Sequence, residues 1–250
     1  GVGIGVVSIV SPIYISEVAM ADRRGALVSL YQLAITIGFL FAYFINWWIL
    51  SVAETAALDP AARFVSDFMN RTMVDEYWRG MLGSETIPAL LFFFIIFLIP
   101  ESPRWLIVHG EGTKASSVLQ KIYLSPDEAS RQKSITEDSI KGEVKTEWKA
   151  LLSPGILKAV LIGSAIAILG QFMGVNAVLY YGPEIFKEAG LSSGDALFSQ
   201  VLVGFVNMGT TVIALLIIDK VGRKNLVYWG VSGMILSLLM IGFYFIFPEQ

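Results

Sequence analysis

Long apolar stretches alternate with shorter polar segments along the whole chain. Six of the stretches are long enough to cross the hydrocarbon core of a bilayer as a helix, which takes about 20 mainly apolar residues. They are Gly1–Val18, Leu27–Leu50, Met81–Ile99, Ile156–Phe186, Ala196–Ile218 and Leu226–Phe247. The pattern predicts an all-α integral membrane protein with about six transmembrane helices.

The fourth stretch is longer than one span requires. It contains Gly170, Gly174, Gly182 and Pro183, and glycine and proline are the usual causes of a kink or break in a helix. We therefore expect an interrupted helix, broken near Gly174.

The polar segments differ in their basic residues, which concentrate on the cytoplasmic side of short loops. Arg23 and Arg24 follow the first span, and Lys220, Arg223 and Lys224 follow the fifth. A further basic set, at 104–149, follows the third span. These segments are predicted to be cytoplasmic, and the mainly acidic segments 54–76 and 184–195 to face outside.

The segment 100–154 is the one stretch that resembles a soluble protein. Apolar residues recur in it at helical spacing, which predicts short amphipathic helices; an unstructured linker between two bundles is the alternative. The domain organisation that follows is three spans in 1–99, a cytoplasmic helical linker in 100–154 and three further spans in 155–250.

Composition supports a membrane protein and excludes several other classes. Hydrophobic residues make up 55% of the chain and charged residues 16%, too few charges to cover a soluble domain of this length. The net charge of −3 includes no basic block for nucleic acid. Without cysteine, and with His109 as the one histidine, we expect no metal site and no cofactor. Because the chain begins and ends in apolar stretches, we expect further spans before and after it.

Acidic and basic side chains recur together at the predicted cytoplasmic ends of the spans. Near the membrane surface such groups can pair and separate reversibly, because water rehydrates both partners. We expect them to form a network that holds the helices together; solvated helix ends are the alternative. The residues are Glu17, Arg24, Glu101, Arg104, Asp219 and Arg223.

Uncharged polar side chains lie inside otherwise apolar spans. A carboxamide offers a donor and an acceptor in one plane, which suits the hydroxyl groups of a sugar. Asn176 and Tyr180 are one turn apart on one helix face, and Gln171 can join them if the helix distorts at Gly174. Amides that merely join helices are the alternative. The candidates are Gln32, Gln171, Asn176, Tyr180 and Asn207.

Glu85 is the one acid well inside a predicted span. A carboxylic acid at membrane depth favours its neutral form and tends to be functional. It is therefore a candidate for proton coupling, and a neutral acid bonded to a neighbouring helix is the alternative.

Four stretches together resemble the sugar porters of the major facilitator superfamily, and in particular their proton-coupled members for xylose. By the resemblance, the chain covers about the fourth to the ninth of twelve helices. The matching stretches are Pro12–Gly25, Pro100–Trp105, Gln171–Asn176 with Tyr180 and Tyr181, and Asp219–Lys224.

The resemblance also implies roles for single residues. Gln32, Gln171, Asn176 and Asn207 would contact sugar, with Tyr180 and Tyr181 closing the outer side, and Glu85 would match an acid of the proton symporters. Two departures leave the sugar open: Gly170 replaces a glutamine of many relatives, and Phe39 replaces a glutamine of the xylose symporters.

The function implied is transport of a monosaccharide, a hexose or a pentose such as xylose, by alternating access with a proton. We expect a non-enzymatic, multi-pass, monomeric protein of a bacterial inner membrane. A facilitative uniporter is the main alternative, followed by a sugar sensor and a membrane enzyme.

Overall fold

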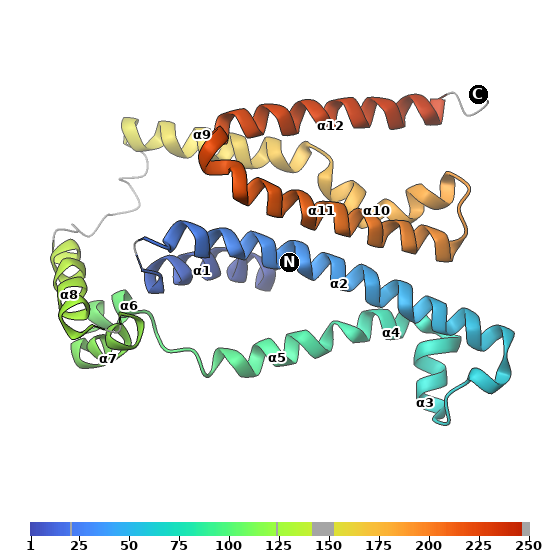
Figure 1. The fold of residues 1–250 in the computed structure, drawn as a ribbon, viewed down its shortest axis with the longest axis horizontal. Coiled ribbons are helices and arrows are strands. Elements are labelled where there is room, and N and C mark those ends of the chain that lie inside the picture. Colours follow the sequence, from blue (N-terminus) through green and yellow to red (C-terminus); the bar gives the residue numbers. More distant parts are fainter. Residues whose placement is uncertain (21, 124, 142–152, 247–250) are drawn as a thin grey trace.

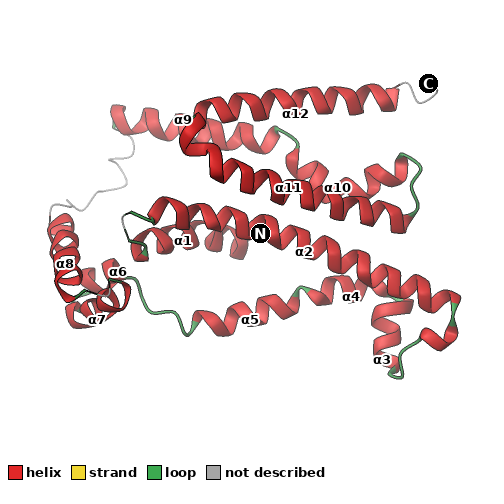
Figure 2. Cartoon of the chain, in the orientation of Figure 1, coloured by secondary structure: helices red, strands yellow, loops and turns green. Residues whose placement is uncertain are grey.

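The computed structural model describes residues 1–20, 22–123, 125–141 and 153–246. Within these ranges every regular element is helical, as Figure 2 shows. The long helices lie roughly alongside one another, and a cluster of short helices lies at one end (Figure 1).

The first half of the chain contributes α1 (Val2–Val18), α2 (Arg24–Leu58), α4 (Tyr77–Ser84) and α5 (Thr86–Ile96). The third predicted span is divided, because α4 ends at Ser84 and α5 begins at Thr86. Glu85 alone separates the two helices, and together they form one candidate membrane span, Tyr77–Ile96, where the third span was predicted. Helix α2 continues eight residues beyond the predicted Leu50, into the polar end where Glu54 lies.

The second half contributes α9 (Pro154–Phe172), α10 (Val175–Glu188), α11 (Ser193–Val221) and α12 (Arg223–Ile246). The fourth predicted span is thus two helices, and the expected break near Gly174 is confirmed. Phe247, the predicted end of the sixth span, lies outside the described residues.

Among the described residues, five helical stretches are long and apolar enough to cross a membrane. The exception among the six predicted spans is α1, whose 17 described residues are shorter than the usual span. Large apolar side chains of these helices are exposed in the isolated chain, among them Phe92, Leu161 and Leu239. Such outward apolar surface suits a hydrocarbon solvent and not water.

Helices α2 and α11 form the main contact between the two halves, side by side in Figure 1. Gly204 of α11 permits the approach, since a Cβ there would lie 3.0 Å from Cδ2 of Tyr43 and 3.3 Å from Cα of Leu40. Ile49 and Val201 are buried in these two helices. Small residues allow backbones to pack closely where the hydrophobic effect cannot drive association.

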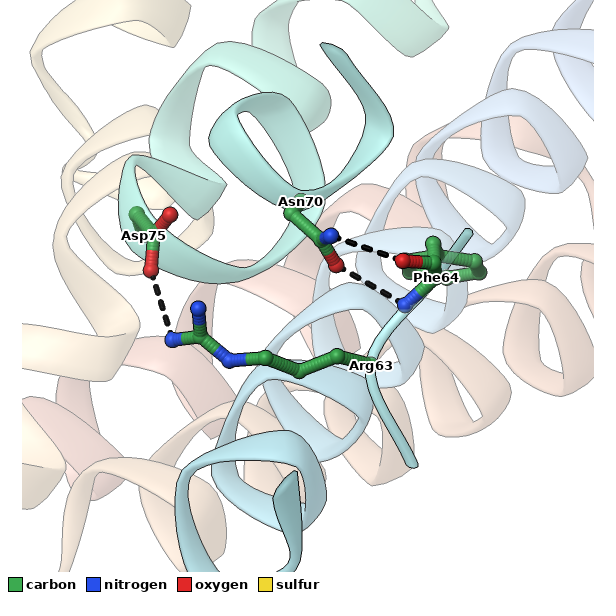
Figure 3. Close-up of polar contacts among 4 residues, drawn as sticks. All are labelled: Arg63, Phe64, Asn70 and Asp75. Atoms are coloured by element: carbon green, nitrogen blue, oxygen red, sulfur yellow. Dashed lines mark hydrogen bonds and ion pairs between the residues drawn. The ribbon is translucent and has the colours of Figure 1, made fainter. Parts of the chain in front are cut away.

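The predicted outer segment 54–76 is folded. It contains a 3₁₀ turn (Pro60–Ala62), α3 (Asp67–Asn70) and a π-helical turn (Arg71–Asp75). Arg63 pairs with Asp75 at 2.9 Å, and the Asn70 carboxamide accepts from N–H of Phe64 and donates to its carbonyl, as Figure 3 shows. The turn between α2 and α4 is therefore ordered by its own polar side chains.

The predicted cytoplasmic linker forms three helices, α6 (Pro103–Val108), α7 (Gly112–Ile122) and α8 (Pro126–Lys141). Leu106 of α6 and Ala115 and Val118 of α7 form a small buried core. The Ser102 side chain caps α6 by accepting from N–H of Trp105 at 3.1 Å. The amphipathic helices are confirmed over 103–141, and residues 142–152 lie outside the described residues.

The arrangement of the ends agrees with the predicted sidedness. The α6–α8 cluster, the α1–α2 turn and the α11–α12 turn lie at one end of the long helices in Figure 1, and α3 and the α10–α11 turn lie at the other. The segments predicted to be cytoplasmic thus share one end.

Candidate functional site

The interruption between α9 and α10 brings two predicted sugar ligands together. Gly174 has φ +81°, a left-handed conformation that glycine adopts without steric cost. The turn allows Nδ2 of Asn176 to donate to Oε1 of Gln171 at 2.7 Å. In an uninterrupted helix, residues five positions apart would point in clearly different directions. The break therefore creates a pair of adjacent amides.

The amide pair keeps hydrogen-bonding capacity after this internal contact. Oδ1 of Asn176 can accept, and Nε2 of Gln171 can donate. Both residues are exposed in the isolated chain. An acceptor and a donor held a few ångströms apart match a sugar, whose neighbouring hydroxyls each donate and accept.

An aromatic contact joins α2 to α10 beside this pair. The ring centroids of Phe39 and Tyr180 are 6.2 Å apart, and those of Phe39 and Tyr43 are 6.0 Å apart. Tyr180 is one turn beyond Asn176 on α10. The structure therefore brings Phe39 and Tyr180 together from helices far apart in the sequence.

The remaining sugar candidates lie apart from this contact. Gln32 shares the face of α2 that carries Phe39, about 10 Å earlier along the helix axis. Asn207 lines a cavity of about 700 Å³, together with Gly174 and Val175, on the other face of α10 from Asn176. Tyr181 is 65% exposed, next to Tyr180 at 64%.

Part of the predicted charge network surrounds one cavity of about 270 Å³. Glu17, Arg24 and Arg104 all line it, and α7 and α8 contribute Tyr123 and Gln132. The cavity thus collects groups from the two ends of the α1–α2 turn and from the segment 103–139. Between Glu17 and Arg24 themselves, which are both described, the structure forms no ion pair within 4.0 Å.

Of the other three members of that network, the structure describes the side chain of Glu101 alone. Glu101 lines a neighbouring cavity of about 500 Å³ with Trp105 and Lys114. The side chains of Asp219 and Arg223 lie outside the described residues. The structure therefore brings three of the six charged groups together.

Tyr123 is a member of this cavity that sequence reasoning missed. Burial raises the pKa of its phenol, Arg24 opposes that rise, and the acids Glu128 and Asp22 add to it. These influences show that the ring lies near the α1–α2 turn. No sequence pattern indicated this, because an aromatic residue at the end of a short amphipathic helix is unremarkable in sequence.

Glu85 lies at the interruption between α4 and α5. Its side chain is exposed in the isolated chain, and its carbonyl accepts from N–H of Ala89 at 3.3 Å. The acid predicted inside a span therefore lies at a local break in the helix.

Tyr43 and Gln200 are two more polar residues that sequence reasoning missed. Oη of Tyr43 donates to the carbonyl of Leu179 at 2.9 Å, and Nε2 of Gln200 donates to the same oxygen at 3.1 Å. Gln200 is 1% exposed. Position in an apolar helix could have singled out Gln200, but nothing in the sequence paired it with Leu179.

Comparison with known proteins agrees with this helical fold and its polar interruptions. A family profile described as "Sugar (and other) transporter" matches residues 1–250. The chain therefore belongs to the sugar transporter family, within the major facilitator superfamily, and its fold is a partial all-helical membrane fold of that superfamily.

Individual relatives share about a third of the sequence. The D-xylose-proton symporter of Escherichia coli (strain K12) is 36% identical over 242 residues, covering 97% of this chain and 46% of that protein. The arabinose-proton symporter of Bacillus subtilis (strain 168) is 38% identical over 247 residues, covering 98% and 50%. The chain spans about half the length of the curated relatives it matches.

A solved structure is similar in fold as well as in sequence. It is that of the MFS proton:xylose symporter XylE bound to 6-bromo-6-deoxy-D-glucose. The likeness has a TM-score of 0.69 and 38% identity, and covers 89% of this chain and 43% of that one.

Proposed function

We propose that the protein containing this chain carries a monosaccharide, a hexose or a pentose such as xylose, across a bacterial inner membrane together with a proton. The family membership and the two relatives named as sugar-proton symporters support this. The observation that carries the proposal is the Asn176–Gln171 pair at 2.7 Å, held by the break at Gly174.

The proposed sugar site lies between α2 and α10. The amides of Gln171 and Asn176 exchange hydrogen bonds with sugar hydroxyls, while Phe39 and Tyr180 cover the C–H faces of the ring. Gln32 extends the site along α2, whereas Asn207 lines the separate cavity between α10, α11 and α12. Tyr181 joins Tyr180 in closing the outer side.

Transport proceeds by alternating access, in which the predicted three-span units 1–99 and 155–250 rock about the sugar. The linker 100–154 follows them on the cytoplasmic side. Glu17, Arg24, Glu101, Arg104, Asp219 and Arg223 stabilise the state closed toward the cytoplasm. Glu85 takes part in proton coupling. The protein acts as a monomer within the bilayer.

Uptake of labelled xylose into vesicles containing the full-length protein tests the proposal. We expect saturable uptake, and alkalinisation of the medium when sugar is added to de-energised vesicles. Uptake without a proton signal would leave a uniporter. Sugar binding without uptake would identify a sensor, and neither binding nor uptake with any hexose or pentose would refute the proposal.

Asn176→Ala provides the test at the level of the site. It removes the acceptor and breaks the pair with Gln171, so KM should rise while the protein remains folded. Asn225→Ala is the matched control, because Asn225 is at the start of α12 and donates to the carbonyl of Val221 at 3.2 Å.

A further inference from the structure

A backbone carbonyl in α10 lacks its ordinary helical donor. Pro183 lies inside α10, and proline has no N–H to give to the carbonyl four residues earlier. That carbonyl belongs to Leu179. In a membrane, a freed backbone group must find a partner in the protein, because lipid offers none.

Two side chains from different helices supply that partner. Oη of Tyr43, on α2, donates to the Leu179 oxygen at 2.9 Å. Nε2 of Gln200, on α11, donates to it at 3.1 Å. A carbonyl oxygen has two lone pairs, so it can accept both.

Close packing around the two donors fixes their positions. Gln200 is 1% exposed, and Gly182 leaves the room that its carboxamide occupies, since a Cβ at residue 182 would overlap Oε1 of Gln200. One turn further along α11, Gly204 admits the Tyr43 ring at 3.0 Å from its ideal Cβ position. Both donors are thus held by close packing.

The contact also adjoins the proposed sugar site. Leu179 precedes Tyr180, whose ring contacts Phe39 at 6.2 Å, and Phe39 contacts Tyr43 at 6.0 Å. The hydroxyl of Tyr43 therefore holds the backbone of α10, while its ring adjoins the aromatic pair. Any motion that separates α10 from α2 must break this hydrogen bond.

We infer that Tyr43 is a positioning residue that latches α10 onto α2 through the Leu179 carbonyl, that Gln200 of α11 holds this carbonyl in place, and that the contact keeps the outer wall of the sugar site closed. The inference rests on the proposed function. The latch joins the two predicted three-span units, so its strength sets how often the outer side opens. A sugar bound against both Phe39 and Tyr180 also connects α2 with α10, so sugar and latch favour the same state.

Spin labels can report on the latch without any sugar. Cysteines at Leu58 and Glu188, both exposed at the outer ends of α2 and α10, carry the labels in full-length protein freed of other cysteines. Hydrogen bonds between membrane helices contribute about 0.6 kcal/mol on average and at most about 1.7 kcal/mol, so Tyr43→Phe should shift the ratio of separated to closed distances by about threefold and by no more than about sixteenfold. Tyr228→Phe on α12 removes a hydroxyl elsewhere and should shift nothing.

A double-mutant cycle tests the specific part played by the carbonyl. Pro183→Ala restores an N–H to Leu179, so the carbonyl no longer depends on Tyr43. The effect of Tyr43→Phe should then fall below about twofold in the Pro183→Ala background, which is the non-additivity expected of coupled groups. An equal effect of Tyr43→Phe in both backgrounds would overturn the latch.

Transport kinetics separate positioning from general damage. Tyr43→Phe should raise KM by up to the same factor as the population shift, with Vmax changed less than about twofold, because saturating sugar restores closure. Saturating sugar should also return the spin-label distances to the closed value. Loss of Vmax with an unchanged distance distribution would contradict the inference.

A second variant tests the latch if Tyr43→Phe does not fold. Gln200→Met keeps the length of the side chain but removes the donating amide that holds the Leu179 carbonyl in place, so it should shift the same distances, and an unchanged distribution would count against the latch. If the unmodified protein moves no sugar, the proposed function fails, while the sugar-free distances still decide the latch.

Discussion

Helices α10 and α12 belong to the same half of the chain, but α12 is regular and α10 is interrupted. Helix α12 runs from Arg223 to Ile246 without an internal proline. Helix α10 begins after a left-handed glycine and contains Pro183. Tyr43, Phe39 and Gln200, on other helices, all contact α10. The polar contacts that α10 makes with other helices thus lie where α10 is interrupted.

The physical reason lies in the hydrogen bonds of the backbone. A regular helix satisfies its own N–H and C=O groups, so only its side chains can interact, and in lipid most of these are apolar. An interruption exposes backbone groups and redirects side chains, as at Gly174 and Leu179. Both effects create polar surface where the surroundings otherwise contain none.

The largest effect is expected from a substitution that makes α10 a regular helix. Gly174→Val places a β-branched residue at φ +81°, which costs about 1–3 kcal/mol and so favours closing the break. Xylose uptake by the full-length protein should fall more than about tenfold. Gly230→Ala, in open space on α12, should leave uptake unchanged. Equal loss in both variants would mean that the break has no special role.

The amide pair offers the next largest effect. Asn176→Ala removes one sugar contact and the bond to Gln171, so KM should rise about tenfold, the size of one or two lost hydrogen bonds. Competition binding with labelled xylose measures it. Asn225→Ala on α12 should stay within about twofold, and a KM that stayed unchanged for Asn176→Ala would remove this residue from the site.

Glu85 extends the contrast to a second interruption, between α4 and α5. Glu85→Gln keeps the shape of the side chain but cannot release a proton, so sugar-driven alkalinisation should fall at least about fivefold, while exchange of labelled for unlabelled sugar stays within about twofold. Parallel loss of both signals would show that Glu85 supports structure and not coupling.

The smallest effect is expected at the water-exposed end of the helices, because water can satisfy the backbone groups that a break in a helix leaves free. Arg24 is exposed, and exposed ion pairs contribute about 0–1 kcal/mol. Arg24→Ala should therefore shift the population toward the inward-open state by at most about fivefold, as measured by labelling of a cysteine placed at Ser16, which lines the same cavity. A shift away from that state would contradict the network.

Local pattern predicted much of the fold. Apolar length located the spans, proline and glycine located the break near Gly174, and helical spacing located α6 to α8. Each of these depends on residues near one another in the sequence, so it could be recognised without the fold. The interruption at Glu85 lies in the short polar stretch Ser84–Thr86, between Gly83 and Pro88, so a local signal was present there but was not recognised.

The candidate site was predicted in part. The turn at Gly174 was expected to allow Gln171 to join Asn176, and the hydrogen bond between them agrees with that expectation. The place of Asn207 on a different face of α10 could not be predicted, because it depends on how α10 and α11 are rotated against each other. Tyr43 was overlooked since a tyrosine among aromatic residues in a span carries no signal of its own.

The sequence by itself determined that this chain is a membrane protein. It also determined which helix ends lie on the same side and where one helix must break. These properties follow from hydropathy, charge and the backbone chemistry of single residues. Only the tertiary structure decided that the oxygen freed by Pro183 meets Tyr43, because 136 residues separate Tyr43 from Leu179. Helix packing sets such a contact, and no local pattern records it.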